Sequence, residues 1–150
     1  MVSSLPAARR RVCYDPVCRS HVRGHGRFMD SHEKDQLFRR GLEAFNSAHF
    51  YDAHEHWEEV WLKTHNSEKI FLQGLIQVAA AFHHYSRANR LGAHRLLQAG
   101  LTKIEPFPNV HRGLEIEPLR AAVRRWLAAL DAGENPEQDE LPHIECHDEG

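Results

Sequence analysis

The sequence has few cysteines and no long apolar run. Its three cysteines, Cys13, Cys18 and Cys146, all lie near the ends of the 150-residue chain. An odd number of cysteines without a secretory signal argues against a disulfide framework and favours reduced thiols in the cytoplasm. No apolar segment approaches the roughly 20 residues that a membrane-spanning helix needs. We therefore expect a cytoplasmic protein with no membrane partner.

A strong net charge and the common catalytic motifs are also missing. The formal net charge is -2, so no overall field favours nucleic acid as a partner. The chain has no glycine-rich phosphate loop and no G-x-S-x-G nucleophile elbow. His54-Glu55 begins like the zinc motif H-E-x-x-H, but position 58 is Glu. The motifs therefore leave open whether the protein is an enzyme.

The first 28 residues differ in charge from the rest of the chain. They contain six arginines and a single acidic residue, Asp15. We interpret residues 1–29 as a basic, disordered arm, since an arginine-rich and acid-poor segment without an apolar core is not a secretory signal. The alternative is that residues 1–28 extend the natural reading frame upstream and that Met29 is the true start.

Residues 30–131 are predicted to form an all-α domain, a compact bundle of about five helices. Asp30 and Glu33 have the spacing of a capping box at its start. Apolar residues then recur at helical spacing in segments placed at about 31–46, 50–63, 67–89, 90–104 and 118–132. The third segment, with Ser67 as its predicted N-cap, is apolar nearly all round, which is typical of a central helix.

The remaining segments are predicted to be irregular. Residues 105–116 contain two prolines and are expected to form a loop. Residues 132–150 are acidic, contain histidine and are expected to form a flexible tail. The fold class is therefore all-α, with a flexible arm at one end and a flexible tail at the other.

One face of the second helix carries the strongest candidate site. His54, Glu58 and Trp61 are spaced i, i+4 and i+7, which places them on one side of a helix. An imidazole and a carboxylate one turn apart can bind the same divalent metal. Alternatively, the carboxylate can orient the imidazole for proton transfer. Trp61 and Trp57 are expected to form the wall of the pocket and exclude water.

The third helix offers ligands that would complete a metal site. Its narrow polar stripe contains Gln77 and His84, and zinc requires three or four protein ligands. Two histidines with one carboxylate suit zinc or ferrous iron. We therefore predict a divalent-metal site formed by His54, Glu58, His84 and Gln77. The alternative is a structural or protein-interaction module in which His54 and Glu58 form a buried polar pair that fixes the register.

A second group of metal-binding residue types lies in the two terminal segments. Its members are Cys13, Cys18, His21 and His25 of the arm, with His143, Cys146 and His147 of the tail. The C-x-x-x-x-C spacing matches common zinc modules poorly, so this site ranks below the helical one.

The motifs of the helical region resemble a known family. They are Phe38-x-x-Gly41-x-x-x-Phe45-Asn46, Phe50-Tyr51-Asp52-Ala53-His54-Glu55-x-Trp57-Glu58-x-x-Trp61, Phe71-Leu72-Gln73-Gly74-Leu75-Ile76-Gln77-Val78-Ala79-Ala80 with His84, and Asn89-x-x-Gly92-Ala93. Together they are similar to the bacterial and archaeal domain-of-unknown-function family 309, over roughly residues 36–104.

The resemblance implies a compact helical fold and an uncharacterised function. The hallmark of the family, H-x-x-x-E followed by an aromatic residue, has been suggested to bind metal, and it corresponds here to His54, Glu58 and Trp61. The arm and the tail lie outside the resemblance. Substrate, partners and oligomeric state, including a homo-oligomer, are left open by the sequence.

Overall fold

The computed structural model describes residues 29–148 of the chain. Within them lie five α-helices: α3 (Ser31–Asn46), α4 (Phe50–Leu62), α5 (Asn66–Ser86), α6 (Arg90–Ile104) and α7 (Ile116–Asp131). A hairpin of β1 (Val110–His111) and β2 (Leu114–Glu115) joins α6 to α7, and the 3-10 turn η1 (Gln138–Glu140) follows α7. The prediction of an all-α bundle with about five helices is confirmed. The arm and its cysteines, Cys13 and Cys18, lie outside the described residues.

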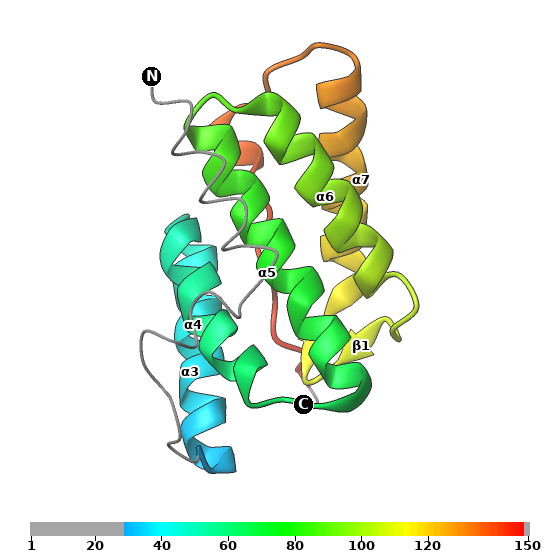
Figure 1. The fold of residues 1–150 in the computed structure, drawn as a ribbon. Helices are drawn as coiled ribbons and strands as arrows, with labels where there is room; N and C mark the ends of the chain where they lie inside the picture. The colour runs from blue at the N-terminus through cyan, green and yellow to red at the C-terminus, as the bar shows by residue number, and fades with distance from the viewer. Residues whose placement is uncertain (1–28, 149–150) are drawn as a thin grey trace.

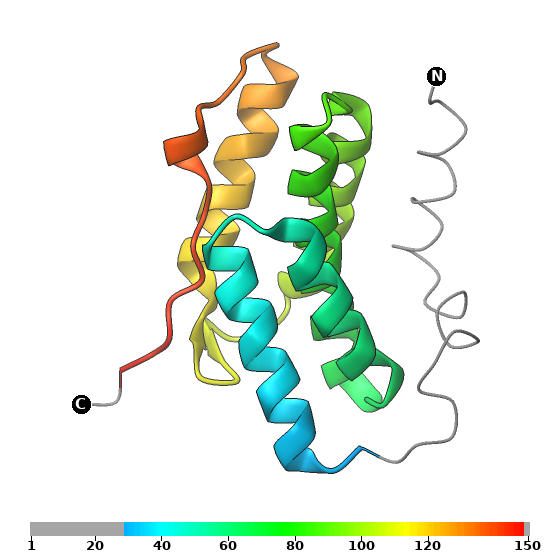
Figure 2. The same cartoon turned by 90° about the vertical axis from the view of Figure 1, so that its left-hand side faces the viewer.

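Helix α5 lies in the middle of the bundle. Figure 1 shows α3 and α4 on one side of it and α6 and α7 on the other, and Figure 2 shows the same arrangement from the side. Its apolar residues are buried around most of its circumference, as Phe71, Leu72, Leu75, Val78 and Phe82 illustrate. A helix of this kind is stable only when neighbours cover it. None of the helices in residues 29–148 is both long and apolar enough to cross a lipid bilayer.

The predicted capping box marks the start of α3. The Asp30 side chain accepts a hydrogen bond from the Glu33 backbone N–H at 2.8 Å, and the Glu33 carboxylate accepts one from the Asp30 N–H at 3.2 Å, as the capping box predicts. The bounds predicted for the third helix were less accurate. It begins at Asn66 rather than after a Ser67 cap, and the side chain of its N-cap residue, His65, makes no capping hydrogen bond.

The end of α5 is set by a turn that the sequence pattern did not indicate. Ala88 adopts a left-handed conformation with φ of 63°, which ends the helix at Ser86 instead of near Asn89. The N–H of Asn89 then bonds back to the carbonyl of His84 at 2.9 Å, the arrangement of a Schellman motif. This leaves the Asn89 side chain free to cap the next helix, and its Oδ1 accepts from the Gly92 N–H at 2.9 Å.

Helix α3 packs closely against α4 where the indole of Trp57 lies over Gly41. Trp57 is fully buried, and its Nε1–H donates to the carbonyl of Phe38 at 3.1 Å. A Cβ atom added to Gly41 would lie 2.2 Å from Trp57 Nε1. The absence of a side chain at position 41 is therefore what allows the two helices to approach.

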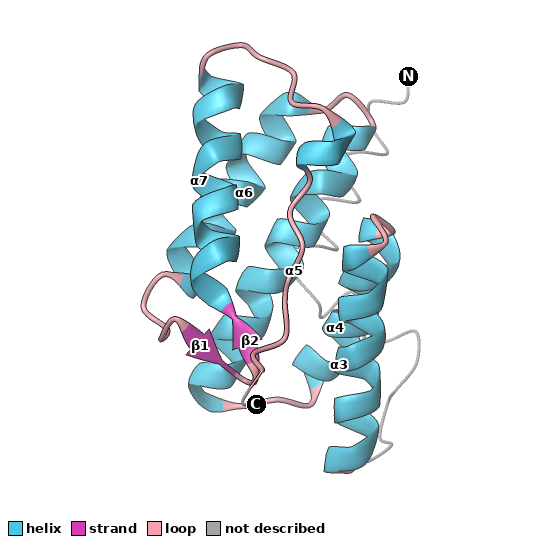
Figure 3. Cartoon of the chain, turned by 180° about the vertical axis from the view of Figure 1, so that it is seen from behind, coloured by secondary structure: helices cyan, strands magenta, loops and turns pink. Residues whose placement is uncertain are grey.

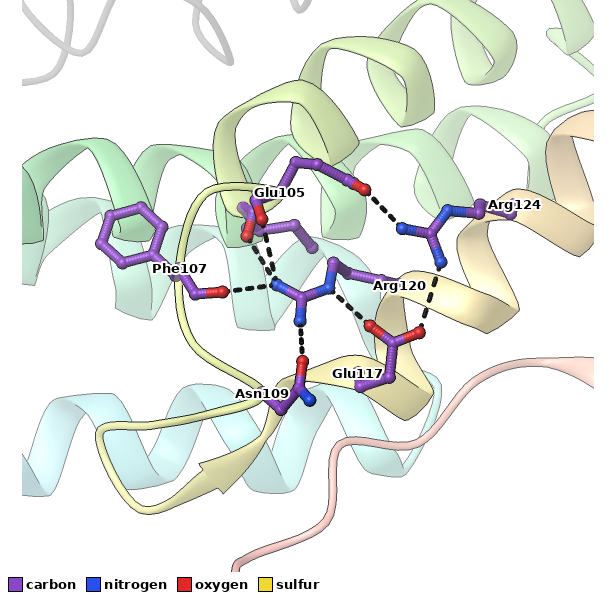
Figure 4. A network of polar contacts seen from close by, with 7 residues as sticks. Glu105, Phe107, Asn109, Glu117, Arg120 and Arg124 are labelled. Atoms are coloured by element: carbon purple, nitrogen blue, oxygen red, sulfur yellow. Dashed lines mark hydrogen bonds and ion pairs between the residues drawn. The ribbon is translucent and has the colours of Figure 1, made fainter.

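The connection between α6 and α7 is organised by a buried arginine. Arg120 is 4% exposed, and its guanidinium donates to the carbonyls of Ile104 and Phe107 at 3.1 and 2.8 Å and to Asn109 Oδ1 at 2.6 Å (Figure 4). The planar fork of an arginine suits several acceptors at once. The segment predicted as a loop over 105–116 is thereby held in one conformation, including the short hairpin, and α7 begins at Ile116 rather than near Pro118.

The surface carboxylates of Glu117 and Glu105 extend this network from Arg120 to Arg124. Glu117 Oε1 accepts from Arg120 Nε at 2.9 Å and Glu117 Oε2 from Arg124 at 3.4 Å, while Arg124 also pairs with Glu105. The hydrogen bond from Arg120, and then the positive charges of Arg120 and Arg124, hold the pKa of the Glu117 carboxyl below its usual value near 4.5. The same pairing, led by the hydrogen bond to Glu105, raises the pKa of Arg124.

The segment after α7 has little regular structure and runs along the bundle to α3 (Figure 3). Ile144 is buried with 2% exposure. Its backbone N–H and C=O both bond to the side-chain amide of Asn46, at 2.8 and 3.0 Å. The tail predicted to be flexible thus has an anchoring point at Ile144, and a second contact comes from Trp126 Nε1, which donates to the Glu140 carbonyl at 3.0 Å.

We predict that Gly41→Ala destabilises the fold. The new methyl group would force the Trp57 indole to move within a packed interface, so the free energy of unfolding should fall by about 1–3 kcal/mol. Urea unfolding followed by circular dichroism measures this change. Arg40→Ala, at an exposed neighbouring position, is the control and should unfold like the wild type. Equal stability of all three proteins would show that the helix contact is looser than described.

We also predict a pH-dependent effect of Glu117→Gln. Because the folded state lowers the pKa of Glu117, the ionised carboxylate stabilises the fold above about pH 4.5, and this contribution disappears as the pH falls through the lowered pKa. The variant should therefore be less stable than the wild type at pH 7, and the two should converge once the pH has fallen below the lowered pKa of Glu117. Urea unfolding at several pH values tests this. A difference that is constant with pH would contradict the assigned ion pairs.

Candidate metal centre

The buried face of α4 carries two polar side chains, His54 and Glu58. Each is 1% exposed, although the residues around them on this face, such as Ala53, Trp57 and Val60, are apolar. Burial of a carboxylate costs several kcal/mol unless a positive charge or hydrogen bonds compensate. The prediction that His54 lies within the apolar arc of the helix agrees with its burial, and Glu58 proves to be inside the interface rather than at its border.

The local backbone orients the imidazole of His54. Its Nδ1 lies 3.4 Å from the carbonyl oxygen of Tyr51, one turn earlier. A carbonyl can only accept, so Nδ1 carries a proton in this contact. The other ring nitrogen, Nε2, lies 4.0 Å from Glu58 Oε2. A backbone carbonyl on the far nitrogen is the usual arrangement behind a metal-binding histidine.

The separation between His54 and Glu58 is compatible with a shared cation. At 4.0 Å the two atoms are too far apart for a direct hydrogen bond. Two ligands of one tetrahedral zinc ion are about 3.4 Å apart, given metal–ligand distances near 2.0–2.2 Å. A small rotation of either side chain therefore brings both atoms to ligand distance. A lone pair and a carboxylate approach each other favourably only when a proton or a metal cation lies between them.

Glu55 is a second acidic group close to this pair, and the sequence pattern did not indicate it. One ligand atom from each of His54, Glu55 and Glu58 lies within 4.8 Å of the others. The helical wheel places Glu55 on the opposite, solvent-facing side of α4. Its side chain is half-buried, however, and Oε2 reaches to 3.9 Å from His54 Nδ1. A long flexible side chain can reach past its own face of the helix, so wheel position alone could not identify this group.

Helix α5 contributes a buried amide, Gln77. This residue is 2% exposed, and its Oε1 has no hydrogen-bond partner among residues 29–148. An unsatisfied buried carbonyl oxygen costs about 1–3 kcal/mol, and such an atom calls for a water molecule, a donor or a cation. Amide oxygen is a ligand for hard and borderline divalent metals. The burial of Gln77 shows that the polar stripe of α5 is not a solvated edge.

His84 is buried on α5 as well, but its ring is oriented by a different contact. The residue is 4% exposed, and its Nδ1 lies 3.1 Å from Asn89 Nδ2. Because an amide nitrogen donates, Nδ1 accepts, and the neutral ring carries its proton on Nε2. Asn89 is fixed in this orientation by its capping bond to Gly92. His84 is not part of the group of ligand atoms formed by His54, Glu55 and Glu58.

The two tryptophans predicted to form a pocket wall differ in environment. Trp57 packs into the core between Phe38 and Phe45, with ring centroids 6.1 and 5.8 Å away. Trp61 is half-buried at the end of α4, and Lys69 Nζ lies 3.8 Å above its ring. Its indole Nε1 is buried without a hydrogen-bond partner in the described part of the chain. Of the two tryptophans, Trp61 is therefore better placed to form the wall of a pocket, because Trp57 is enclosed in the core.

A comparison of the sequence with known proteins finds a family match over the segment that contains this site. Residues 38–96, which include His54, Glu58, Gln77 and His84, match the model of the domain of unknown function DUF309. A protein of Aquifex aeolicus (strain VF5), described as "Uncharacterized protein", is 30% identical over 124 residues, which are 82% of this chain and 36% of that protein. The chain thus spans about a third of the length of that relative. These findings support the resemblance to the DUF309 family, with the match to its model extending over residues 38–96.

Proposed function

We propose that this protein binds one divalent transition-metal ion, zinc or iron, between α4 and α5. The observation that carries the proposal is the buried pair of His54 and Glu58, with the imidazole oriented by Tyr51 so that Nε2 points at the carboxylate across 4.0 Å. An ion at this position would be held by the Glu58 carboxylate and the His54 imidazole, whose ligand atoms already lie close together.

The surrounding residues support this assignment. Gln77 Oε1, buried and without a partner among residues 29–148, is the ligand we propose from α5, and Glu55 is an additional carboxylate within reach. Imidazole, carboxylate and amide oxygen form a donor set that suits zinc or ferrous iron. Such an ion supplies Lewis acidity, which can polarise a bound substrate. His84 stays a predicted ligand. Its Nδ1 accepts from Asn89 in the present orientation. Ligation through Nε2 would require the ring proton to move to Nδ1 and the Asn89 amide to turn.

Metal analysis of the full-length, tag-free protein tests the proposal. We expect about one zinc or iron per chain after purification under anaerobic conditions, and strong loss of metal in His54→Ala and Glu58→Gln, by tenfold or more in affinity, since even outer-shell changes cost about 10–100-fold. His56→Ala, two residues away on α4, is the matched control and should keep its metal. Absence of stoichiometric metal in the wild type, or its retention in His54→Ala, would overturn the proposal.

A cysteine variant distinguishes this site from one formed by the terminal segments. Cys13→Ser with Cys18→Ser removes the thiol ligands of the arm and leaves α4 and α5 unchanged. If the helical site holds the ion, the double variant should bind as much metal as the wild type. Loss of metal in the double variant alone would assign binding to the arm instead.

The second candidate is a structural module in which the same residues hold the helices in register. The orientation of His84 favours it, because Asn89 joins the end of α5 to the start of α6 through both His84 and Gly92. This function predicts that His54→Ala lowers the free energy of unfolding by about 1–3 kcal/mol with no change in metal content. The metal analysis above therefore separates the two candidates.

The proton position on His84 is a further prediction. In the wild type the neutral ring should carry its proton on Nε2, because Asn89 Nδ2 donates to Nδ1. In Asn89→Asp both side-chain oxygens can only accept. One would keep the hydrogen bond from the Gly92 N–H, and the other should draw the proton of the His84 ring to Nδ1. Side-chain ¹⁵N chemical shifts report the tautomer. A wild-type proton on Nδ1 would contradict the assigned contact with Asn89 and would leave Nε2 with the lone pair that a metal ligand needs.

A further inference from the structure

A cavity of about 460 Å³ lies between the start of α4, the end of α5, α7 and the segment that follows α7. Its volume is within the range of small-molecule sites in proteins, about 300–1,000 Å³. It borders the candidate metal centre without including it. Tyr51 lines the cavity, and the centroid of its ring is 5.3 Å from that of His54.

Aromatic side chains from three helices line this cavity. They are Phe50, Tyr51, Phe82, Tyr85 and Trp126. The polar groups of two of them are already used by the tail, since Tyr85 Oη donates to the Pro136 carbonyl at 3.2 Å and Trp126 Nε1 to the Glu140 carbonyl at 3.0 Å. These two residues can therefore offer a ligand no donor, only their rings and the acceptor oxygen of the Tyr85 hydroxyl. Tyr51 is 45% exposed, so its ring is accessible to a molecule that enters.

Asp52 and Glu137 contribute carboxylates to the cavity, and His49 and His83 contribute imidazoles. Among residues 29–148, no lysine or arginine lines it. Asp52 comes from the first turn of α4 and Glu137 from the segment after α7. A lining of aromatic rings with two acidic side chains favours a cation, because the ring faces carry negative potential and the carboxylates add to it.

We propose that this cavity binds a small organic ammonium cation with apolar substituents, such as a methylated amine. The aromatic rings contact the substituents and the positive charge, and Asp52 and Glu137 neutralise it. A simple metal cation would not use the apolar wall, and a neutral apolar ligand would not use the two carboxylates. The proposal does not rest on metal binding at His54 and Glu58.

Binding of a matched pair of probes to the full-length protein tests the charge requirement. Choline and 3,3-dimethylbutan-1-ol have the same shape, and only choline is charged. We expect choline to shift the ¹⁵N–¹H signal of the Trp126 indole, which lines the cavity, and to leave that of the fully buried Trp57 unchanged. Choline should bind at least about fivefold more tightly than the alcohol at pH 8 and low salt. Equal affinities, or no binding of choline, would overturn the proposal.

Two conservative variants locate the charges. Asp52→Asn and Glu137→Gln keep the size of the exposed side chains, and each should weaken choline binding by about two- to fivefold, with a larger loss in the double variant. Glu59→Gln is the matched control, since Glu59 is on α4 but does not line the cavity. Choline affinity unchanged in the double variant, or reduced equally by Glu59→Gln, would contradict the assigned site. Repeating the titration on metal-free protein should give the same result, which keeps this test separate from that of the metal centre.

Discussion

The candidate site depends on the contact between Trp57 and Gly41. Trp57 lies on α4 between His54 and Glu58 in sequence, and its burial against α3 fixes the rotation of α4 about its own axis. Once that rotation is fixed, residues one turn apart on the adjacent face point towards α5. The polar pair is therefore placed on this face of the bundle by the packing of an aromatic ring against a glycine.

Periodicity and capping signals allowed the helical fold to be predicted, because the information for each is local. The apolar repeat defined five segments, and the wide apolar arc of the third identified the central helix. The burial of His54 followed from its position on the wheel. Features that depend on distant contacts were not predictable in this way. Arg120 resembles its exposed neighbours Arg124 and Arg125 in sequence, and its burial follows from carbonyls in the α6–α7 connection that only the folded chain brings together.

The candidate metal centre also contains features that could be predicted from the sequence and features that could not. The pairing of His54 with Glu58 required only helical spacing, whereas the approach of Glu55 depended on the conformation of a flexible side chain. The role of Asn89 could not be read from the sequence because it depends on Ala88, a residue that ends α5 in a left-handed conformation without being glycine. The aromatic cavity could not be predicted either, since the segment after α7 forms one of its sides.

The Asn46–Ile144 contact has a consequence for how the chain reaches its final state. It joins residues 98 positions apart, at the end of the first described helix and near the end of the chain. During synthesis the helical hairpin of α3 and α4 can form from neighbouring residues, but the amide of Asn46 meets its backbone partner only when the last segment has been made. Contacts of such long sequence separation form late because loop closure costs entropy. The cavity beside α7 is therefore completed after the helices have assembled, whereas the polar pair on α4 can be in place earlier.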